Sequence, residues 1–176
     1  LNPKSYVPSD LAFPEIVLRR GSGSGDMQLK KETAKALEEM SAAAKKADLS
    51  IMLASGYRSY QVQTSVYGSE VARFGEAIAS MESARPGYSE HQTGFAADLA
   101  PSSGQCDIAD CFANTPEGKW LAKNAYKFGF ILRYQQNKTA ITGYRYEPWH
   151  FRFVGKELSK EMARQKVTTL EEFFNL

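Results

Sequence analysis

The chain has 176 residues, with 22 lysines and arginines against 20 aspartates and glutamates, so its formal net charge is +2. This length predicts one domain that buries a sizeable core without a stapling metal or disulfide. The near balance of charges argues against a protein that grips nucleic acid through phosphates, since such proteins carry a clear basic excess. A hydrophobic content of 43% excludes intrinsic disorder, and no apolar run reaches the roughly 18 residues that predict a membrane span.

The N-terminal region predicts an extended arm followed by a loop, together residues 1–25. Pro3, Pro8 and Pro14 oppose a long helix in the arm, residues 1–20. The GSGSG run at 21–25 then predicts a flexible surface loop, with a flap over a substrate site as the alternative.

Two helices and two strands are predicted over the first half of the remaining chain. Asp26 is a candidate cap for a helix that ends near Asp48, because apolar residues recur three and four apart between them. Apolar runs predict strands over 50–54 and 95–100. Ser59 is a candidate cap for a second helix, whose core-facing residues we expect to be Val62, Val66, Phe74 and Ile78.

The second half of the chain predicts a helix, three strands and further helices. Thr115 and Pro116 form a strong helix start, and Gly129 is a natural stop. Strands are predicted over 130–134, 141–146 and 149–154, and the last helix over 169–174. The order of elements lacks a regular strand–helix–strand alternation, so it predicts an α+β fold in a single domain, residues 1–176.

The two cysteines, Cys106 and Cys111, lie in the sequence CDIADC and admit three interpretations. A disulfide would stabilise the fold by about 2 kcal/mol. We favour it because Asp, Gly and Ser around the pair indicate an exposed loop, and it would imply an oxidising, extracytoplasmic compartment. A structural zinc site would need a second pair of ligands that is not apparent. Two free buried thiols are the third possibility.

The chain contains two histidines, His91 and His150, and each has a carboxylate nearby in sequence. Asp98 comes after His91 and lies within the apolar strand predicted over 95–100. Burying a charged carboxylate there requires a partner, either a metal ion or an arginine. Glu147 precedes His150 in EPWH, and Pro148 keeps this segment extended. Two imidazoles, one carboxylate and an open position make a catalytic zinc site, and a further carboxylate serves as general base. The alternative is a pair of unrelated histidines.

Three sequence blocks surround these residues: SGYRSYQVQ at 55–63, SEHQTGFAAD at 89–98 and EPWHFRFVG at 147–155. Together they resemble the VanY-type zinc D-alanyl-D-alanine carboxypeptidases, a family that includes related L,D-carboxypeptidases. These peptidases act on the stem peptides of the bacterial cell wall. They stand in the family's order, the pattern S-x-H-x(6)-D followed by E-P-W-H is intact, and the resemblance extends from about Tyr6 to Gly155.

The resemblance implies a fold, a metal ion and a set of site residues. The fold would be a small central antiparallel sheet with flanking helices, as in hedgehog and D-Ala-D-Ala peptidase domains. Glu147 would be the general base. One Zn²⁺ per chain would be held by His91, Asp98 and His150. Contacts to the substrate would fall on Arg58, Gln63 and Ser89.

The function that the resemblance implies is removal of the terminal D-Ala from stem pentapeptides. An L,D-carboxypeptidase acting on tetrapeptides uses the same residues, and a dipeptidase is a further enzyme alternative. An inactive zinc-bearing binding module would lack the base or the substrate arginine, and Glu147 and Arg58 are both present. We expect a monomer that acts outside the cytoplasm of a bacterium, on peptidoglycan stem peptides, without nucleic acid or a membrane span.

Three residues around the EPWH motif have more ordinary expected roles. Trp149 is expected to anchor the core, although a pocket wall is the alternative. Arg145 and Arg152 are expected to face solvent from their strands, with the alternative that they offset acidic groups near the site.

Overall fold

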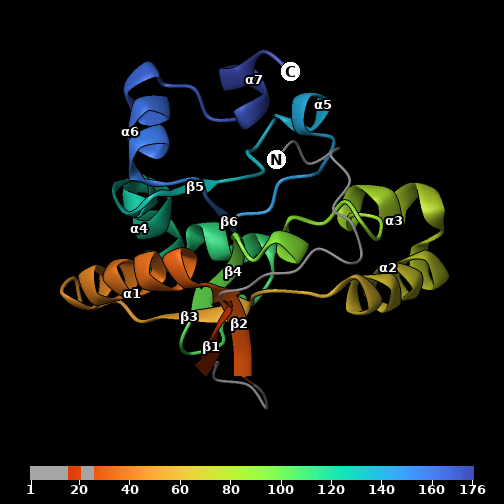
Figure 1. The fold of residues 1–176 in the computed structure, drawn as a ribbon, viewed down its shortest axis with the longest axis horizontal. Helices are drawn as coiled ribbons and strands as arrows, with labels where there is room; N and C mark the ends of the chain where they lie inside the picture. The colour runs from red at the N-terminus through yellow and green to blue at the C-terminus, as the bar shows by residue number, and fades with distance from the viewer. Residues whose placement is uncertain (1–15, 21–25) are drawn as a thin grey trace.

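The computed structural model describes residues 16–20 and 26–176. Predictions for the proline-rich part of the arm and for the GSGSG loop lie outside these residues. A four-stranded antiparallel sheet forms the centre, and helices surround it (Figure 1). In sheet order its strands are β3 (Ile51–Ser55), β4 (Ala96–Pro101), β6 (His150–Phe153) and β5 (Phe130–Leu132). The predicted α+β class with a small antiparallel sheet is confirmed.

A two-stranded hairpin precedes the sheet. In it β1 (Ile16–Arg20) pairs antiparallel with β2 (Asp26–Lys30). The prediction that Asp26 caps a helix is therefore wrong, because the backbone from this residue onward pairs with β1 and α1 (Lys31–Lys45) begins only after β2. The predicted apolar face of α1 is confirmed by its buried residues, which include Thr33, Ala36, Leu37, Met40 and Ala44.

The helices lie on both sides of the sheet and at its edges. The cap of the fourth helix is confirmed, since the Thr115 hydroxyl accepts a hydrogen bond from the Gly118 N–H at 3.0 Å. The helices after α1 are α2 (Tyr60–Phe74), α3 (Glu76–Glu82), α4 (Pro116–Asn124), α5 (Thr139–Thr142), α6 (Lys156–Gln165) and α7 (Leu170–Phe174). Short 3-10 helices are η1 (Glu90–Thr93), η2 (Asp110–Asn114) and η3 (Ala125–Phe128).

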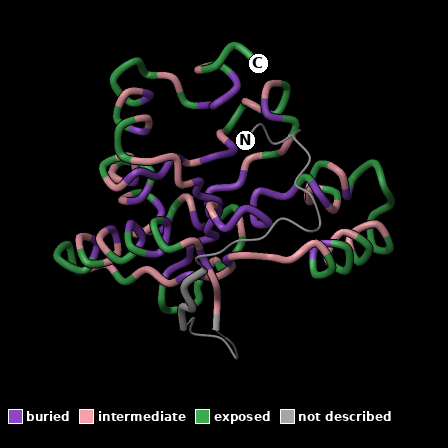
Figure 2. Tube along the Cα trace, in the orientation of Figure 1, coloured by how far each residue is buried: buried purple, intermediate pink, exposed green. Residues whose placement is uncertain are grey.

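The helix that starts after Ser59 does not bury the side predicted for it. Ser59 does cap α2, but the predicted core residues Val62, Phe74 and Ile78 are 52%, 45% and 47% exposed. The pair α2–α3 projects from one side of the sheet, at the right of Figure 1, and its outer turns are exposed in Figure 2. Apolar periodicity therefore does not mark the packed side of α2, whose one fully covered residue is the polar Gln63.

The strand predicted over 141–146 is also wrong. The segment begins inside the one-turn helix α5 and continues as irregular backbone. Gly143 ends the helix in the left-handed conformation, with φ of +83°. The Thr142 hydroxyl then accepts a hydrogen bond from the Tyr144 N–H, which ties the chain into a local turn instead of a sheet.

The core lies around the sheet and against α1, where buried residues converge in Figure 2. Every residue of β4 is buried, so both faces of this central strand are covered. Trp149 is 6% exposed and belongs to the core, as predicted. None of the helices that the structure describes is long and apolar enough to cross a bilayer.

Candidate metal centre

The register of the sheet brings Asp98 and His150 together. Asp98 in β4 is the direct antiparallel partner of His150, the first residue of β6. Directly opposite residues point to the same face of a sheet. Their side chains therefore meet, and His150 Nδ1 lies 3.3 Å from Asp98 Oδ1.

His91 reaches the same place from η1, the turn that leads into β4. Gly94 makes this turn possible, since it adopts a left-handed φ of +72° where a side chain would be strained. The imidazole Nε2 lies 3.2 Å from Asp98 Oδ2, and Nδ1 lies 2.7 Å from the carbonyl oxygen of Gly56. The carbonyl fixes the proton on Nδ1 and leaves Nε2 free to act as a ligand.

These three residues fit a zinc ion. One ligand atom from each of His91, Asp98 and His150 lies within 4.8 Å of the others, and all three residues are buried. Asp98 Oδ1 is buried without a hydrogen-bond partner among the described residues, as expected for an oxygen that awaits a cation. Two imidazoles with one carboxylate are a zinc donor set with a position left open.

The charges in the site favour metal binding. Burial raises the pKa of Asp98, but His91 and His150 outweigh that effect and hold it well below its usual range. Burial likewise lowers the pKa of His150, but hydrogen bonding to Asp98 and Glu147 raises it well above the ordinary value. A divalent cation bound at this carboxylate would displace the proton that the raised pKa favours on His150.

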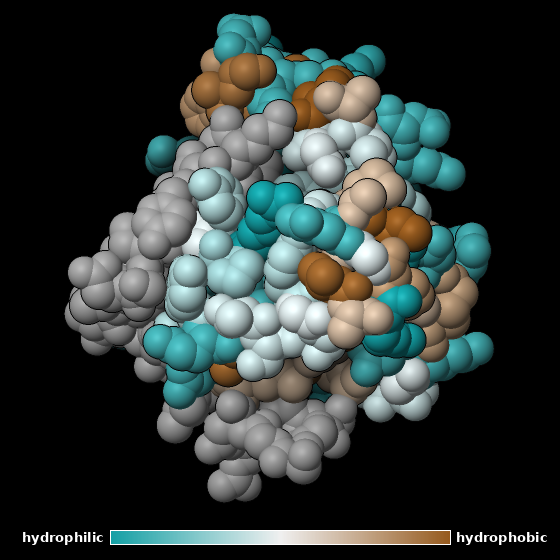
Figure 3. Space-filling view, turned by 90° about the vertical axis from the view of Figure 1, so that its right-hand side faces the viewer, coloured by the Kyte–Doolittle hydropathy of each residue, from teal (hydrophilic) through white to brown (hydrophobic). Residues whose placement is uncertain are grey.

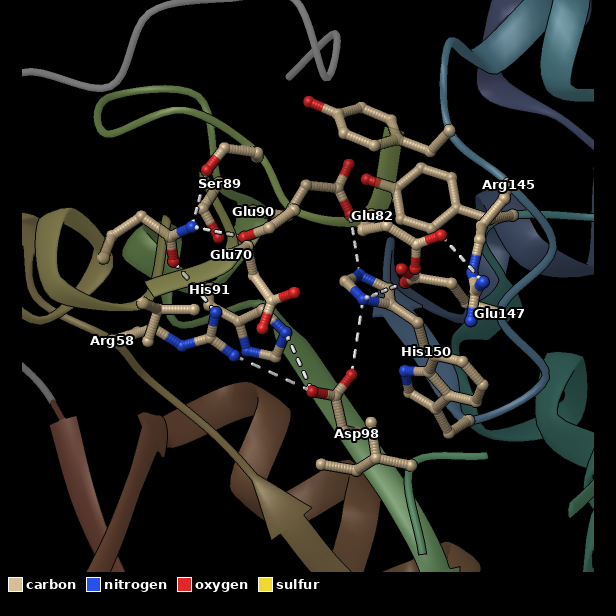
Figure 4. A pocket seen from close by; sticks show the side chains of 18 residues that line it. Arg58, Glu70, Glu82, Ser89, Glu90, His91, Asp98, Arg145, Glu147 and His150 are labelled. Carbon is tan, nitrogen blue, oxygen red and sulfur yellow. Dashed lines mark hydrogen bonds and ion pairs between the residues drawn. The ribbon is translucent and has the colours of Figure 1, made fainter. Parts of the chain in front are cut away.

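Glu147 contacts the same nitrogen of His150 that faces Asp98, as the dashed lines in Figure 4 show. The turn at Pro148 and Trp149 brings the two ends of EPWH together, so Glu147 Oε2 lies 3.3 Å from His150 Nδ1. The Glu147 N–H donates to the carbonyl of Tyr134 at 3.2 Å, which fixes the start of this turn. A carboxylate held there is placed to exchange protons with a group bound at the metal position.

A cavity of about 330 Å³ opens over these residues. Residues of α2 and α3 form part of its lining. The side of the molecule that carries these helices shows hydrophilic residues interspersed with hydrophobic ones in Figure 3. The cavity is lined by all seven residues predicted for the site: Arg58, Gln63, Ser89, His91, Asp98, Glu147 and His150.

Arg58 and Gln63 form one unit at the wall of this cavity. Arg58 Nη1 donates to Gln63 Oε1 at 2.9 Å, and Nη2 donates to Ser55 Oγ at 3.1 Å. The Gln63 amide nitrogen donates in turn to the carbonyl of Ala84 at 2.6 Å. Gln63 is wholly buried and its amide is engaged on both sides, so it orients Arg58 instead of offering a free group to a ligand.

Sequence analysis missed several residues around the site. The hydroxyl-bearing rings of Tyr134 and Tyr144 line the cavity, and the Tyr134 ring packs on His150 with centroids 4.8 Å apart. Burial, followed by the charges of Glu90 and Glu147, raises the pKa of Tyr144 to about 12, so this phenol stays protonated at neutral pH.

A buried ion-pair cluster behind His150 was also missed. Glu90 and Arg133 are 4% and 0% exposed, and the prediction that Arg152 faces solvent is wrong because it is 5% exposed. The sequence signal was available, because Arg133 directly follows the apolar run 130–132. A charge buried there needs a buried partner, as Asp98 does. Arg145 is 46% exposed in its side chain but also lines the cavity, where it pairs with Glu82 at 2.8 Å.

The disulfide prediction is confirmed, since Cys106 and Cys111 are bonded. The loop that they close contains Ile108, which lines the cavity although it is 47% exposed. Ile108 adopts a left-handed φ of +45°, which is rare for a β-branched residue. The disulfide thus holds a strained loop at the edge of the site.

The fold and the site define a class: a small α+β domain with a buried His–Asp–His set at the base of an open cavity. The VanY family, described as D-alanyl-D-alanine carboxypeptidase, matches residues 26–156, and the chain belongs to this family. The predicted resemblance is confirmed, and the match covers every residue of the metal centre.

Individual relatives agree with this assignment. The chain is 44% identical over 172 residues to YodJ of Bacillus subtilis (strain 168), which covers 98% of this chain and 63% of YodJ. The chain thus spans less than two thirds of that relative.

Two solved structures are similar along nearly the whole chain. The LdcB LD-carboxypeptidase has a TM-score of 0.91 at 40% identity, covering 99% of this chain and 83% of LdcB. The vancomycin resistance D,D-pentapeptidase VanY, solved as a variant in complex with Zn(II), has a TM-score of 0.78 at 30% identity, covering 96% and 93%.

Proposed function

We propose that this chain is a zinc-dependent D,D-carboxypeptidase domain that removes the terminal D-Ala from peptidoglycan stem pentapeptides. The observation that carries the proposal is the convergence of His91, Asp98 and His150 under one cavity with Glu147 beside them. Membership of the VanY family and the likeness to a zinc-bound D,D-pentapeptidase support it.

Zinc would be held by His91, Asp98 and His150, and when bound it would polarise the scissile carbonyl and make a water molecule more acidic. Glu147 accepts a proton from the attacking water. As that proton leaves the water, its oxygen forms a bond to the scissile carbonyl carbon. Glu147 then delivers the proton to the nitrogen of the departing D-Ala as the carbon–nitrogen bond breaks. The guanidinium of Arg58, 19% exposed in its side chain, binds the terminal carboxylate of the peptide.

Gln63 and Ser89 contribute to substrate binding in different ways. Gln63 holds the direction of the Arg58 fork through the 2.9 Å hydrogen bond. Ser89 is 4% exposed and lines the cavity next to η1, where its hydroxyl is available to a bound peptide. The phenol of Tyr144, protonated at neutral pH, supplies a further donor in the cavity.

A second candidate is an L,D-carboxypeptidase that removes D-Ala from the stem tetrapeptide. It is favoured by the likeness to LdcB, which exceeds the likeness to VanY in both TM-score and identity. Both reactions use the same metal centre and base, so the choice depends on how the cavity accepts the residue before the scissile bond.

Mass spectrometry of two synthetic peptides tests the two candidates. The zinc-loaded chain is incubated with a pentapeptide ending in D-Ala-D-Ala and, separately, with a tetrapeptide ending in one D-Ala. Loss of one alanine from the pentapeptide supports the D,D activity, and loss from the tetrapeptide alone would replace it with the L,D activity. Cleavage of neither, with zinc bound, would overturn both. Glu147→Gln is the inactive control.

We also propose that the protein acts outside the cytoplasm, as a monomer with one peptidase domain. The disulfide between Cys106 and Cys111 supports an oxidising compartment. The proposed ligands, base and substrate arginine all come from one chain, so a single copy would suffice for the reaction. Sedimentation of the purified chain tests the monomer.

A further inference from the structure

A cluster of four buried charged residues lies behind the metal centre, and the proposed reaction does not use it. Its members come from four separate places in the chain, and each is at most 6% exposed. They are Glu90 in η1, Arg133 after β5, Arg152 in β6 and Glu171 in α7. Burying charges is costly, and apolar residues of similar size often stabilise a fold as well. Such a cluster therefore calls for a role beyond packing.

The two oxygens of Glu90 are used differently. Oε1 lies 2.9 Å from Arg133 Nε and 3.1 Å from Arg152 Nη1. Oε2 has no hydrogen-bond partner among the described residues and lies 3.4 Å from Nε2 of His150, which also has none. Figure 4 shows the Glu90 carboxylate reaching over the His150 ring on the side away from Asp98. One oxygen is thus anchored, and the other faces the imidazole.

His150 presents its two nitrogens to different surroundings. Nδ1 lies 3.3 Å from both Asp98 Oδ1 and Glu147 Oε2, which places it on the metal side. A neutral imidazole that binds a metal through one nitrogen carries its proton on the other. That proton would lie on Nε2, where Glu90 Oε2 is an acceptor 3.4 Å away.

We propose that Glu90 is a positioning residue, which accepts a hydrogen bond from His150 Nε2–H and so fixes the tautomer and direction of this metal ligand. This inference rests on the proposed function in that His150 must be a zinc ligand. An anionic acceptor also makes the imidazole a stronger ligand than a neutral one would. His91 has only the carbonyl of Gly56 at its outer nitrogen, so the two histidines are unequal ligands.

Arg133 extends this constraint to the C-terminal helix α7. Its guanidinium donates to Glu90 through Nε, and to Glu171 through Nη1 at 3.0 Å and Nη2 at 2.7 Å. Glu171 lies beyond residues 26–156, the part matched by the family. Burial lowers the pKa of Arg133, but Glu90 and Glu171 outweigh that effect and raise it, so the guanidinium stays charged. Helix α7 therefore supports the metal centre from outside it.

The first test is a spectrum of the wild-type chain. Because the protein has two histidines, a long-range nitrogen–proton spectrum of the zinc-loaded chain with ¹⁵N-histidine contains two imidazoles. We expect opposite tautomers, one protonated on Nδ1 (His91) and one on Nε2 (His150), with the Nε2 proton protected from exchange. Two identical tautomers, or an Nε2 proton that exchanges freely with water, would overturn the proposal. Peptide hydrolysis is not measured, so failure of the proposed activity is distinguishable.

The second test is zinc affinity, measured by competition with a chromogenic chelator. Glu90→Gln should weaken zinc binding roughly 10–100-fold, the usual effect of losing an outer partner of a metal ligand. Glu171→Gln should weaken it less but in the same direction. The matched control is Glu172→Gln on the same helix, since Glu172 pairs with the half-buried Lys138 and not with the cluster.

Two results would contradict the proposal. Folded Glu90→Gln that binds zinc as tightly as wild type would show that Glu90 only packs. Equal zinc affinities of the Glu171→Gln and Glu172→Gln variants would show that α7 does not support the metal centre. If Glu90→Gln does not fold, the wild-type spectrum and Glu171→Gln still decide, because Glu90 is intact in both.

Discussion

Gln63 accepts a hydrogen bond from Arg58 at 2.9 Å, and this bond joins a wholly buried amide to a guanidinium at the cavity wall. The two residues lie on either side of the Ser59 cap, so the start of α2 sets their separation. The consequence is that the group proposed to bind the substrate carboxylate has its direction fixed before any substrate arrives, which reduces the entropy lost on binding.

Arg58→Lys should therefore impair substrate binding more than the chemical step. Lysine keeps the charge but loses the fork that matches a carboxylate, and hydrogen bonds to charged groups contribute about 1.5–3 kcal/mol. We expect kcat/KM for the cleaved peptide to fall by about 10–150-fold, mostly through KM. Steady-state kinetics on the zinc-loaded chain measures this, and an unchanged KM would remove Arg58 from substrate binding.

Gln63→Leu should change kcat/KM in the same direction as Arg58→Lys, although Gln63 has no free polar group for the substrate. The leucine would leave Arg58 Nη1 without its acceptor and allow the guanidinium to turn. Gln61→Leu is the matched control, because Gln61 is exposed on the same helix. If both variants behave like wild type, Gln63 does not orient the arginine.

Glu147→Gln should remove activity while keeping the metal. Glutamine preserves size but does not take up a proton, and general bases contribute at least about a hundredfold. We expect the rate of D-Ala release to fall by that amount or more, with zinc content by mass spectrometry equal to wild type. If the Glu147→Gln variant keeps activity within tenfold of wild type, Glu147 is not the general base.

Asp98→Asn should weaken zinc binding by more than the roughly 10–100-fold typical of outer partners, because it removes the anionic ligand itself. Competition with a chelator gives the affinity, and removal of zinc from the wild type should abolish activity in parallel. Asp110→Asn is the control, since its side chain is 71% exposed and lies by Arg145. Equal affinities for the two variants would contradict the ligand set.

Loss of the disulfide should destabilise the chain without emptying the metal site. The double substitution Cys106→Ser with Cys111→Ser removes a short-loop constraint of about 2 kcal/mol. In a chain of this size that lowers Tm by about 4–8 °C. Calorimetry measures the shift. KM should also rise, because Ile108 would leave its left-handed conformation at the cavity edge. If Tm and KM are both unchanged, the loop neither stabilises the fold nor shapes the cavity.

Alkaline pH should destabilise the fold partly through Tyr144. Burial raises its pKa from 10.0 to about 12, so between these values the unfolded chain releases a proton that the folded chain keeps. The contribution is intact below pH 10 and is lost as pH rises toward 12. Denaturant unfolding across this range should decline less steeply for Tyr144→Phe than for wild type. Identical slopes would show that the folded state does not protect this proton.

The sequence predicted the elements whose information is local. Thr115 with Pro116 and Ser59 were correct helix caps, because a cap bonds to backbone only three residues away. Prediction failed where contacts with residues distant in the sequence determine the local structure. Asp26 has the side chain of a cap but lies in β2, and residues 141–146 have the composition of a strand but form a turn.

The sequence by itself determined the chemistry of the site, since two scarce histidines beside Asp98 and Glu147 stand in an ordered family pattern. Only the tertiary structure decided their geometry: the β4–β6 register sets Asp98 against His150. It also decided what lies behind them. The partners of Glu90 are 43 or more residues away in sequence, and no local pattern encodes which buried charges will meet when the sheet closes.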